Sequence, residues 1–147
     1  MTGLQRLGPE PFADEFSFSY MQTWFERRQR PVKNALLDQA MVAGIGNIYA
    51  DEALFLSGIR PNVRCDRISP KRLKTLHKAI RKVLTDSIQA GGTTFSDFRD
   101  IHGINGNYGG VAWVYDREAE PCRLCQTPIQ RIKLAGRSAH YCPNCQE

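Results

Sequence analysis

Apolar side chains recur with helical spacing through the first ninety residues of the chain. Phe16, Tyr20 and Trp24 lie four residues apart, so we expect them to form one apolar stripe on a first helix. That helix must end before Pro31, because the residue that precedes a proline disfavours the helical backbone. The basic stretch Arg27-Arg28-Gln29-Arg30 then lies at its C-terminal end.

A second helix is predicted from about Lys33, and Gly44-Ile45-Gly46 ends it with two residues that can adopt positive φ. Asn47 is expected to be the N-cap residue of a third helix, which ends at Gly58. This stretch therefore predicts a helix, a tight glycine turn and another helix. The expected core positions of the second helix are Leu36, Leu37, Ala40 and Met41, and Asp51 and Glu52 fall in the early turns of the third.

Ser69-Pro70 predicts the start of a fourth helix, with the serine as N-cap and the proline in the first turn. Gly91-Gly92 predicts its end. The apolar positions between them follow one helical face and predict a core-facing side. These positions are Leu73, Leu76, Ile80, Val83, Leu84 and Ile88.

The rest of the chain predicts irregular structure followed by a hairpin. Thr93 to Gly110 is rich in Gly, Asn and Thr, which is typical of a loop. Val111 to Tyr115 has strand character. Ile129 to Leu134 and Ser138 to Tyr141 predict a hairpin that turns at Ala135-Gly136. The expected fold class is mainly α, with four helices followed by a small C-terminal β-hairpin.

Composition and charge narrow the class of protein. A chain of 147 residues with 41% hydrophobic residues can form a helical core with a small metal-held unit attached. The 20 Lys+Arg residues outnumber the 15 Asp+Glu residues, and this net charge of +5 suits a polyanionic partner, although it is also compatible with a merely basic surface. No apolar run reaches the roughly 18–20 residues of a membrane span, and Met1-Thr2-Gly3-Leu4 lacks the layout of a secretory signal. We therefore expect a cytoplasmic protein without a membrane partner.

Four of the five cysteines form two pairs, Cys122-x-x-Cys125 and Cys142-x-x-Cys145, on either side of the predicted hairpin. Four thiolates in tetrahedral geometry select zinc, and a closed shell leaves no position for a catalytic water. Two disulfides or an iron–sulfur cluster are the alternatives. The sequence therefore predicts one structural Zn²⁺, and Cys65, which stands alone, is expected to be a small buried hydrophobe.

Two features favour contact with phosphate groups. The hairpin is basic, with no acidic residue from Gln126 to Tyr141. The helix that starts at Asn47 presents free N–H groups, which can bind a phosphate. Each feature also has a simpler interpretation, because the charges can serve solubility alone and Asn47 can serve only as a helix cap. The basic residues of the hairpin are Arg131, Lys133, Arg137 and His140.

Several segments follow one another as they do in a known family. They are Leu7 to Pro11 (LGPEP), Lys33 to Gln39 (KNALLDQ), Val42 to Phe55 (VAGIGNIYADEALF), Gly91 to Thr94 (GGTT) and the tetracysteine tail. Together they closely resemble the C-terminal half of formamidopyrimidine-DNA glycosylase, a family of bacterial repair enzymes for oxidised purines. In that family this half is a helix–two-turn–helix domain with a zinc finger, which grips DNA opposite an N-terminal β-sandwich.

The resemblance implies a domain division and a partner. Residues 1–11 correspond to a linker remnant and residues 12–92 to the helix–two-turn–helix domain. Residues 93–116 correspond to a lesion-recognition loop with a following strand, and residues 117–147 to the zinc finger. Within the loop, Asn105-Gly106-Asn107-Tyr108 resembles a plant or cyanobacterial variant. The implied partner is double-stranded DNA that contains a lesion or an abasic site.

The resemblance also implies roles for individual residues. The family's phosphate-binding lysine and asparagine match Lys33 and Asn47. Its finger arginine matches Arg137, which would bind the same DNA backbone and assist the final elimination, and Arg137 is therefore the catalytic candidate. Arg28 matches a basic DNA-contacting segment, and Tyr49 lies within the matching motif, so both are DNA-binding candidates.

One departure from the family concerns the first residues. The family enzyme begins with a proline whose amine attacks the damaged nucleotide, followed by a glutamate, whereas this chain begins Met1-Thr2-Gly3. We therefore expect the DNA-binding half of a glycosylase/AP lyase, inactive alone, with a separate N-terminal catalytic half as a second partner and the nucleoid as its location. The alternatives are a stand-alone, non-catalytic zinc-containing module that binds nucleic acid and, more remotely, a protein-interaction module.

These assignments carry three expectations. Replacing Lys33, Asn47 or Arg137 by alanine should weaken DNA binding with little change in thermal stability, because exposed charges contribute little to folding. Asn47→Asp should keep the helix cap and repel a phosphate. Zinc removal should unfold the segment after Pro121 while the helices persist on their own core.

Overall fold

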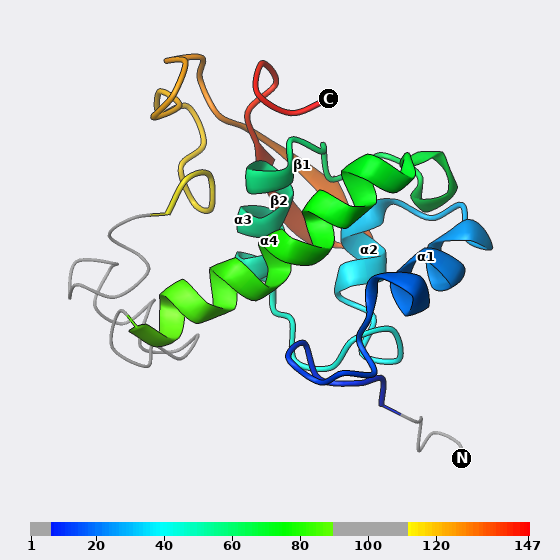
Figure 1. Cartoon of the computed structure of the whole chain (residues 1–147). Helices are drawn as coiled ribbons and strands as arrows, with labels where there is room; N and C mark the ends of the chain where they lie inside the picture. Colours follow the sequence, from blue (N-terminus) through cyan, green and yellow to red (C-terminus); the bar gives the residue numbers. More distant parts are fainter. Residues whose placement is uncertain (1–6, 90–111) are drawn as a thin grey trace.

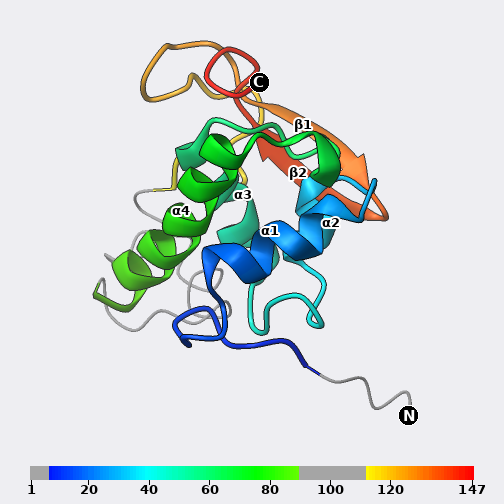
Figure 2. The same cartoon turned by 45° about the vertical axis from the view of Figure 1, so that its right-hand side comes forward.

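The computed structural model describes residues 7–89 and 112–147. The described part is mostly helical with one antiparallel hairpin, which confirms the predicted fold class. Figure 1 shows α4 crossing in front of α3, with α1 and α2 to one side, and Figure 2 shows the hairpin reaching past α3 toward α2. The elements are α1 (Phe18–Glu26), α2 (Val32–Leu36), α3 (Asn47–Ser57), the short 3-10 helix η1 (Cys65–Arg67), α4 (Pro70–Gln89), β1 (Gln130–Leu134) and β2 (Arg137–Tyr141).

Helix α1 begins at Phe18, two residues after the start of the predicted stripe at Phe16. The hydroxyl of Ser17 accepts a hydrogen bond from the backbone N–H of Tyr20 at 3.1 Å and caps the helix. Phe16 therefore lies before the helix, fully buried and stacked on the ring of His77. The buried helical side chains are Met21 and Phe25, so the predicted stripe was displaced by one residue.

Helix α2 is shorter than predicted and ends at Leu36. The carboxylate of Asp38 accepts a hydrogen bond from the N–H of Ala40 at 2.9 Å, and the side-chain amide of Gln39 accepts one from Gly44 at 2.8 Å. Local side-chain bonds of this kind compete with the helical ladder, so the chain turns instead of continuing as a helix. Ala40 is consequently exposed, contrary to the prediction, whereas the predicted burial of Met41 is confirmed.

The turn that follows α2 is closed by the segment at Gly8. The N–H of Gly8 donates to the carbonyl of Gln39 at 2.7 Å, and the N–H of Ala43 donates to the carbonyl of Pro9 at 2.9 Å. A Cβ on Gly8 would lie 2.5 Å from the carbonyl oxygen of Ala40. This position therefore requires glycine, because its backbone lies directly against the backbone of the turn at Ala40.

We expect Gly8→Ala to destabilise the protein by about 1–3 kcal/mol, because the added methyl group forces the backbone of the turn apart. Thermal denaturation followed by circular dichroism would measure the loss. Thr23→Ala, an exposed change on α1, is the control that should leave the melting temperature unchanged. An unaltered melting temperature in Gly8→Ala would contradict the close packing of this segment.

The end of α3 and the start of α4 lie where the sequence predicts them. Gly58 ends α3 with φ of 73°, in the left-handed region that favours glycine. The hydroxyl of Ser69 accepts a hydrogen bond from the N–H of Arg72 at 3.3 Å and caps α4. The predicted core face of α4 is confirmed at Leu73, Leu76, Ile80 and Val83 and partly at Leu84, while the side chain of Ile88, Gly91-Gly92 and the loop 93–110 lie outside the described part.

The described residues form a large and a small hydrophobic cluster. The large one joins all four helices and contains Cys65, where burial raises the pKa of the thiol to about 11, consistent with the predicted small hydrophobe. The small one comprises Phe55 of α3 together with Val114, Cys122, Ile129 and Cys142. The finger therefore shares part of its core with α3.

The predicted strand at Val111 to Tyr115 is wrong for its described part, residues 112–115, which form bends and a turn. The backbone N–H groups of Trp113, Val114 and Tyr115 all donate to the buried carboxylate of Glu52 on α3, at 2.6, 2.9 and 2.9 Å. Donors that converge on one side chain cannot also point to a neighbouring strand. Glu52 thus takes the place of a strand partner.

We expect Glu52→Gln to destabilise the protein by roughly 2–4 kcal/mol, because it replaces charge-assisted hydrogen bonds by weaker ones. The NH₂ group of the glutamine would also face a backbone N–H, and two donors cannot bond each other. Chemical denaturation monitored by circular dichroism would measure it. Glu26→Gln on the exposed end of α1 is the matched control and should have no measurable effect. Equal stability of the two variants would show that the carboxylate is not needed.

Candidate zinc centre and nucleic-acid interface

The four paired cysteines converge on one point. Their Sγ atoms all lie within 4.8 Å of one another. Individual Sγ–Sγ distances are 3.8 Å for Cys122 and Cys145, 3.5 Å for Cys125 and Cys142, and 3.7 Å for Cys125 and Cys145. A tetrahedron with zinc–sulfur bonds of about 2.3 Å has edges of about 3.8 Å, whereas a disulfide requires about 2.05 Å. The set fits one structural Zn²⁺, as predicted, and the disulfide alternative is excluded.

Backbone groups support the cysteine sulfurs. The N–H of Leu124 donates to Sγ of Cys122 at 3.4 Å, and the N–H of Cys145 donates to Sγ of Cys142 at 3.3 Å. Such donors stabilise the negative charge of thiolate ligands and orient them. All four cysteines are buried or half-buried, which suits a structural metal and excludes an open catalytic position.

The second cysteine pair is attached to the C-terminal end of α3. The side chain of Gln146 is fully buried, accepts a hydrogen bond from the N–H of Cys142 at 2.7 Å and donates one to the carbonyl of Ile59 at 2.8 Å. The guanidinium of Arg60 donates to the carbonyls of Gln146 and Pro143 at 2.9 and 2.6 Å. The zinc-held knuckle therefore cannot move independently of the helices.

Lys33 is buried, which contradicts the expectation of an exposed ammonium. Only 1% of Lys33 is exposed, and the Ser138 carbonyl of β2 lies against both its ammonium and the side chain of Asn47 at the start of α3. Its Nζ lies 2.7 Å from Oδ1 of Asp51 and donates to the carbonyl of Ser138 at 2.6 Å. Burial lowers the pKa of Lys33, and the positive charge of Arg137 adds to this, while Asp51 counteracts it. Lys33→Ala should therefore lower thermal stability, contrary to the expectation of little change.

Asp51 connects α3 to helix α2 and to strand β2. It is fully buried, and its Oδ2 accepts hydrogen bonds from the backbone N–H and the ring Nδ1 of His140 at 3.1 and 2.9 Å. His140, which the sequence suggests as part of a basic surface, is 5% exposed and faces the protein interior. The acidic side chains of α3 thus bind other segments and do not serve as exposed partners of the helix dipole.

Asn47 is not the N-cap residue. Gly46 occupies that position, and Asn47 is the first residue of α3. Its side-chain Nδ2 donates to the carbonyl of Ser138 at 3.2 Å, while its Oδ1 is buried without a hydrogen-bond partner among the described residues. The side chain reaches across to the finger instead of curling back on its own helix. In Asn47→Asp a carboxylate oxygen would face the Ser138 carbonyl, so this contact predicts a loss of stability in that variant in place of the unchanged stability that a capping role implies.

Arg137 is exposed at the tip of the hairpin. Ala135 and Gly136 have φ of 52° and 84°, as a two-residue hairpin turn of this hand requires, and Leu134 pairs with Arg137. The predicted hairpin and its turn are confirmed. Because Lys33 and Asn47 both bind the carbonyl of Ser138, the structure brings these two candidates next to Arg137.

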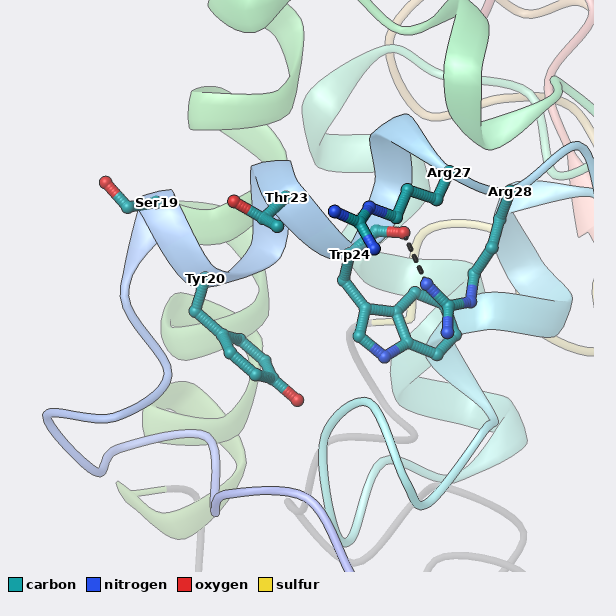
Figure 3. A pocket seen from close by; sticks show the side chains of 6 residues that line it. All are labelled: Ser19, Tyr20, Thr23, Trp24, Arg27 and Arg28. Carbon is teal, nitrogen blue, oxygen red and sulfur yellow. Dashed lines mark hydrogen bonds between the residues drawn. The ribbon is translucent and has the colours of Figure 1, made fainter.

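The other two candidates lie elsewhere. The guanidinium of Arg28 stacks on the ring of Trp24 at 3.4 Å and donates to the Trp24 carbonyl at 2.7 Å. Figure 3 shows both residues beside a hollow of about 540 Å³ along α1. Tyr49 points toward α4, where its hydroxyl and that of Ser87 are 2.8 Å apart. The hollow is lined by Ser19, Tyr20, Thr23, Trp24, Arg27 and Arg28.

Sequence reasoning missed the buried polar residues that hold the site together. The sequence places Asp51 and Glu52 in the early turns of α3, where they can interact with the helix dipole, and Ser138 in a strand. It does not indicate that other segments bind to them. A signal was present, because the residues around these two acids are alanine, isoleucine, leucine and phenylalanine on every side of the helix. Acidic residues in a helix that is apolar all round are buried and need partners.

No helix in the described ranges, residues 7–89 and 112–147, combines the length and the apolar character needed to cross a membrane.

Comparison with known proteins adds family information. Residues 7–99 match the model described as "Formamidopyrimidine-DNA glycosylase H2TH domain", and residues 119–147 match "Zinc finger found in FPG and IleRS". A formamidopyrimidine-DNA glycosylase of Trichodesmium erythraeum is 60% identical over 147 residues, 100% of this chain and 49% of that protein. One of a Synechococcus species is 62% identical over 146 residues, 99% of this chain and 52% of that protein. The chain thus spans about half the length of the curated relatives it matches.

Solved structures of formamidopyrimidine-DNA glycosylases have a similar fold over most of this chain. The MutM (Fpg) protein of Thermus thermophilus superposes with a TM-score of 0.86 at 40% identity, covering 96% of this chain and 54% of that one. A Lactococcus lactis formamidopyrimidine-DNA glycosylase, non-covalently bound to DNA that contains an AP site, superposes with a TM-score of 0.84 at 33% identity, covering 96% and 50%. The zinc-finger match favours zinc over an iron–sulfur cluster at the four cysteines.

Proposed function

We propose that this chain, which belongs to the formamidopyrimidine-DNA glycosylase H2TH-domain family, is the DNA-gripping half of a base-excision glycosylase and AP lyase that acts on oxidised purines. The observation that carries the proposal is the grouping of Lys33, Asn47 and Arg137 around the carbonyl of Ser138. The DNA-bound Lactococcus structure of the same fold supports it. We place the protein in the bacterial cytoplasm, at the nucleoid when it is bound.

In this proposal two elements approach one stretch of DNA backbone. The first turn of α3 offers N–H groups and a partial positive charge, and the amide of Asn47, whose Nδ2 carries two hydrogens, can donate to a phosphate beside the Ser138 carbonyl. Arg137 offers a planar guanidinium that can hold two phosphate oxygens. During elimination the leaving phosphate is anionic, and the same guanidinium would stabilise that charge.

The remaining candidate residues, Lys33, Arg28 and Tyr49, have secondary roles in this proposal. Lys33 contributes positive charge from beneath the site. Arg28, held flat against Trp24, would extend the contact along the backbone from α1, and Tyr49 would belong to the DNA-binding helix α3. We divide the chain as the sequence suggests: residues 1–11 linker, 12–92 helical DNA-binding domain, 93–116 lesion-recognition segment and 117–147 zinc finger. Of these, residues 1–6 and 90–111 lie outside the described part.

Binding of the chain to duplex DNA should weaken steeply with salt, and Arg137→Ala should lower the slope of log K against log salt by about 1, as expected for one lost phosphate contact. Arg137→Lys should recover only part of the affinity, because an ammonium cannot reproduce a two-pronged contact. Fluorescence anisotropy between about 50 and 200 mM salt would measure both effects.

The matched control is Lys82→Ala, which removes an equal charge from the exposed surface of α4. It should change affinity less than Arg137→Ala, and neither variant should change the melting temperature much. If Arg137→Ala has the affinity and the salt slope of the parent, then the finger does not contact phosphate and the proposed site is misplaced.

Borohydride trapping on abasic DNA tests the enzymatic part of the proposal. The chain alone should bind the DNA without forming a covalent adduct, and adding the N-terminal half of the Trichodesmium relative should yield one. An adduct formed by the chain alone would show that it contains its own nucleophile. DNA binding without any adduct under either condition would favour the stand-alone nucleic-acid-binding module.

A further inference from the structure

We propose that Lys33, Asp51 and His140 form a buried positioning device that sets Arg137 against Asn47, and that Lys33 acts through the Ser138 carbonyl without touching the phosphate. The inference rests on the proposed DNA-binding function and deepens it. It assigns a role to Asp51 and His140, and it changes the role of Lys33 from a ligand to a support.

The geometry joins three elements at one carboxylate. Asp51 on α3 holds the ammonium of Lys33 from α2 at 2.7 Å, and it accepts both donors of His140 from β2 at 3.1 and 2.9 Å. The same ammonium continues to the carbonyl of Ser138 at 2.6 Å. Strand β2 is therefore tied at Ser138 and at His140, immediately after Arg137.

Burial argues against a direct phosphate contact by Lys33. The side chains of Lys33 and Asp51 are 1% and 0% exposed, and the ammonium already has a carboxylate and a carbonyl as partners. A phosphate could reach it only if β2 moved away, and that movement would also displace Arg137. Buried ion pairs of this kind stabilise a fold little compared with apolar replacements, but they fix geometry.

The amide of Asn47 supports the same conclusion. It donates to the Ser138 carbonyl that Lys33 also binds, so one oxygen orients both side chains. The Oδ1 of Asn47 is buried without a partner among the described residues, so the Ser138 carbonyl is the side chain's hydrogen-bond partner there. The orientation of Asn47 therefore depends on where the Lys33–Asp51 pair holds β2.

The test is the double variant Lys33→Met/Asp51→Asn, which removes both charges and keeps the side-chain volumes and an acceptor for His140. We expect zinc content and melting temperature close to the parent, because no charge is left unpaired in the interior. We expect DNA affinity to fall by about tenfold, with a salt slope reduced by up to about 1 unit. In the Arg137→Ala/Asn47→Ala background the same double change should have an effect of less than about twofold, since the pair acts through these two residues.

Two results would overturn the inference. A folded double variant with parental affinity and salt slope would show that the pair serves folding alone. A full, additive loss in the Arg137→Ala/Asn47→Ala background would show that Lys33 contacts the DNA itself. If the parent binds DNA without salt dependence, the proposed function itself is wrong. If the parent shows the expected salt dependence and the double variant has the same affinity and salt slope, only this inference is wrong.

A milder variant serves if the double variant does not fold. His140→Phe keeps the aromatic contact with Tyr115, at 5.1 Å between ring centroids, and keeps the Lys33–Asp51 pair, but it removes one of the two ties between Asp51 and β2. We expect its DNA affinity to fall by about threefold in the parent and to stay unchanged in the Arg137→Ala/Asn47→Ala background. An unchanged affinity in the parent background would equally overturn the inference.

Discussion

Removing zinc with a chelator should unfold the finger and lower the melting temperature of the helices while leaving most helical signal in place. Apparent zinc-binding energies of zinc-finger peptides are about 10–16 kcal/mol, far more than a two-stranded hairpin can supply alone. The helices persist because their cluster is formed almost wholly by residues 16–84, with Ala112 and the half-buried Tyr115 as the contributions from the described C-terminal segment. Their stability falls because Phe55, Lys33 and Asp51 lose their partners in the finger.

Tryptophan fluorescence separates the two parts of this prediction. The chain has two tryptophans, of which Trp113 stacks on Phe55 at the edge of the finger and Trp24 lies on α1. In a Trp24→Phe variant, chelation should shift the Trp113 emission to that of an exposed indole, while far-ultraviolet circular dichroism keeps its helical shape. Adding zinc back should restore both signals. Complete loss of helix on chelation, or an unchanged Trp113 emission, would contradict the prediction.

Asp51→Asn should destabilise the protein by about 3–5 kcal/mol, because it leaves the ammonium of Lys33 buried without its counter-charge. Lys33→Met in the same chain should recover most of that loss, since it removes the uncompensated charge. Chemical denaturation of the parent, the single variant and the double variant would measure both steps. The control is Asp86→Asn, which breaks the exposed pair with Lys82 and should cost less than about 1 kcal/mol.

The loss in Asp51→Asn should depend on pH with a defined sign. The pKa of Lys33 is already lowered by burial in the parent, and Asp51 is the group that raises it, so removing Asp51 lowers it further. A lysine whose folded pKa lies below its unfolded value of about 10.4 opposes folding at low pH, and this penalty decreases as the pH rises from the folded pKa and is gone above the unfolded one. The variant should therefore regain stability on the alkaline side sooner than the parent. A loss that is the same at every pH would show that Lys33 is not the group responsible.

The sequence by itself determined the features that depend on neighbouring residues. The glycine that ends α3 and the Ala135-Gly136 turn follow from φ preferences at single positions. The start of α4 follows from a serine cap beside a proline. The zinc site follows from two cysteine pairs on either side of a hairpin, because the spacing brings both pairs to one end of it.

Only the tertiary structure decided which distant groups meet. The bond from Lys33 to Ser138 spans 105 positions, that from Asn47 to Ser138 spans 91, and Asp51 lies 89 positions from His140. The apolar surroundings of Asp51 in its helix can indicate burial, but neither periodicity nor propensity specifies which distant residue is its partner. The resemblance named Lys33, Asn47 and Arg137, but the burial of Lys33 and the partner of Asn47 became visible only with β2 in place. The reason is physical: a buried charge is defined by the groups that enclose it, and here those groups come from the other end of the chain.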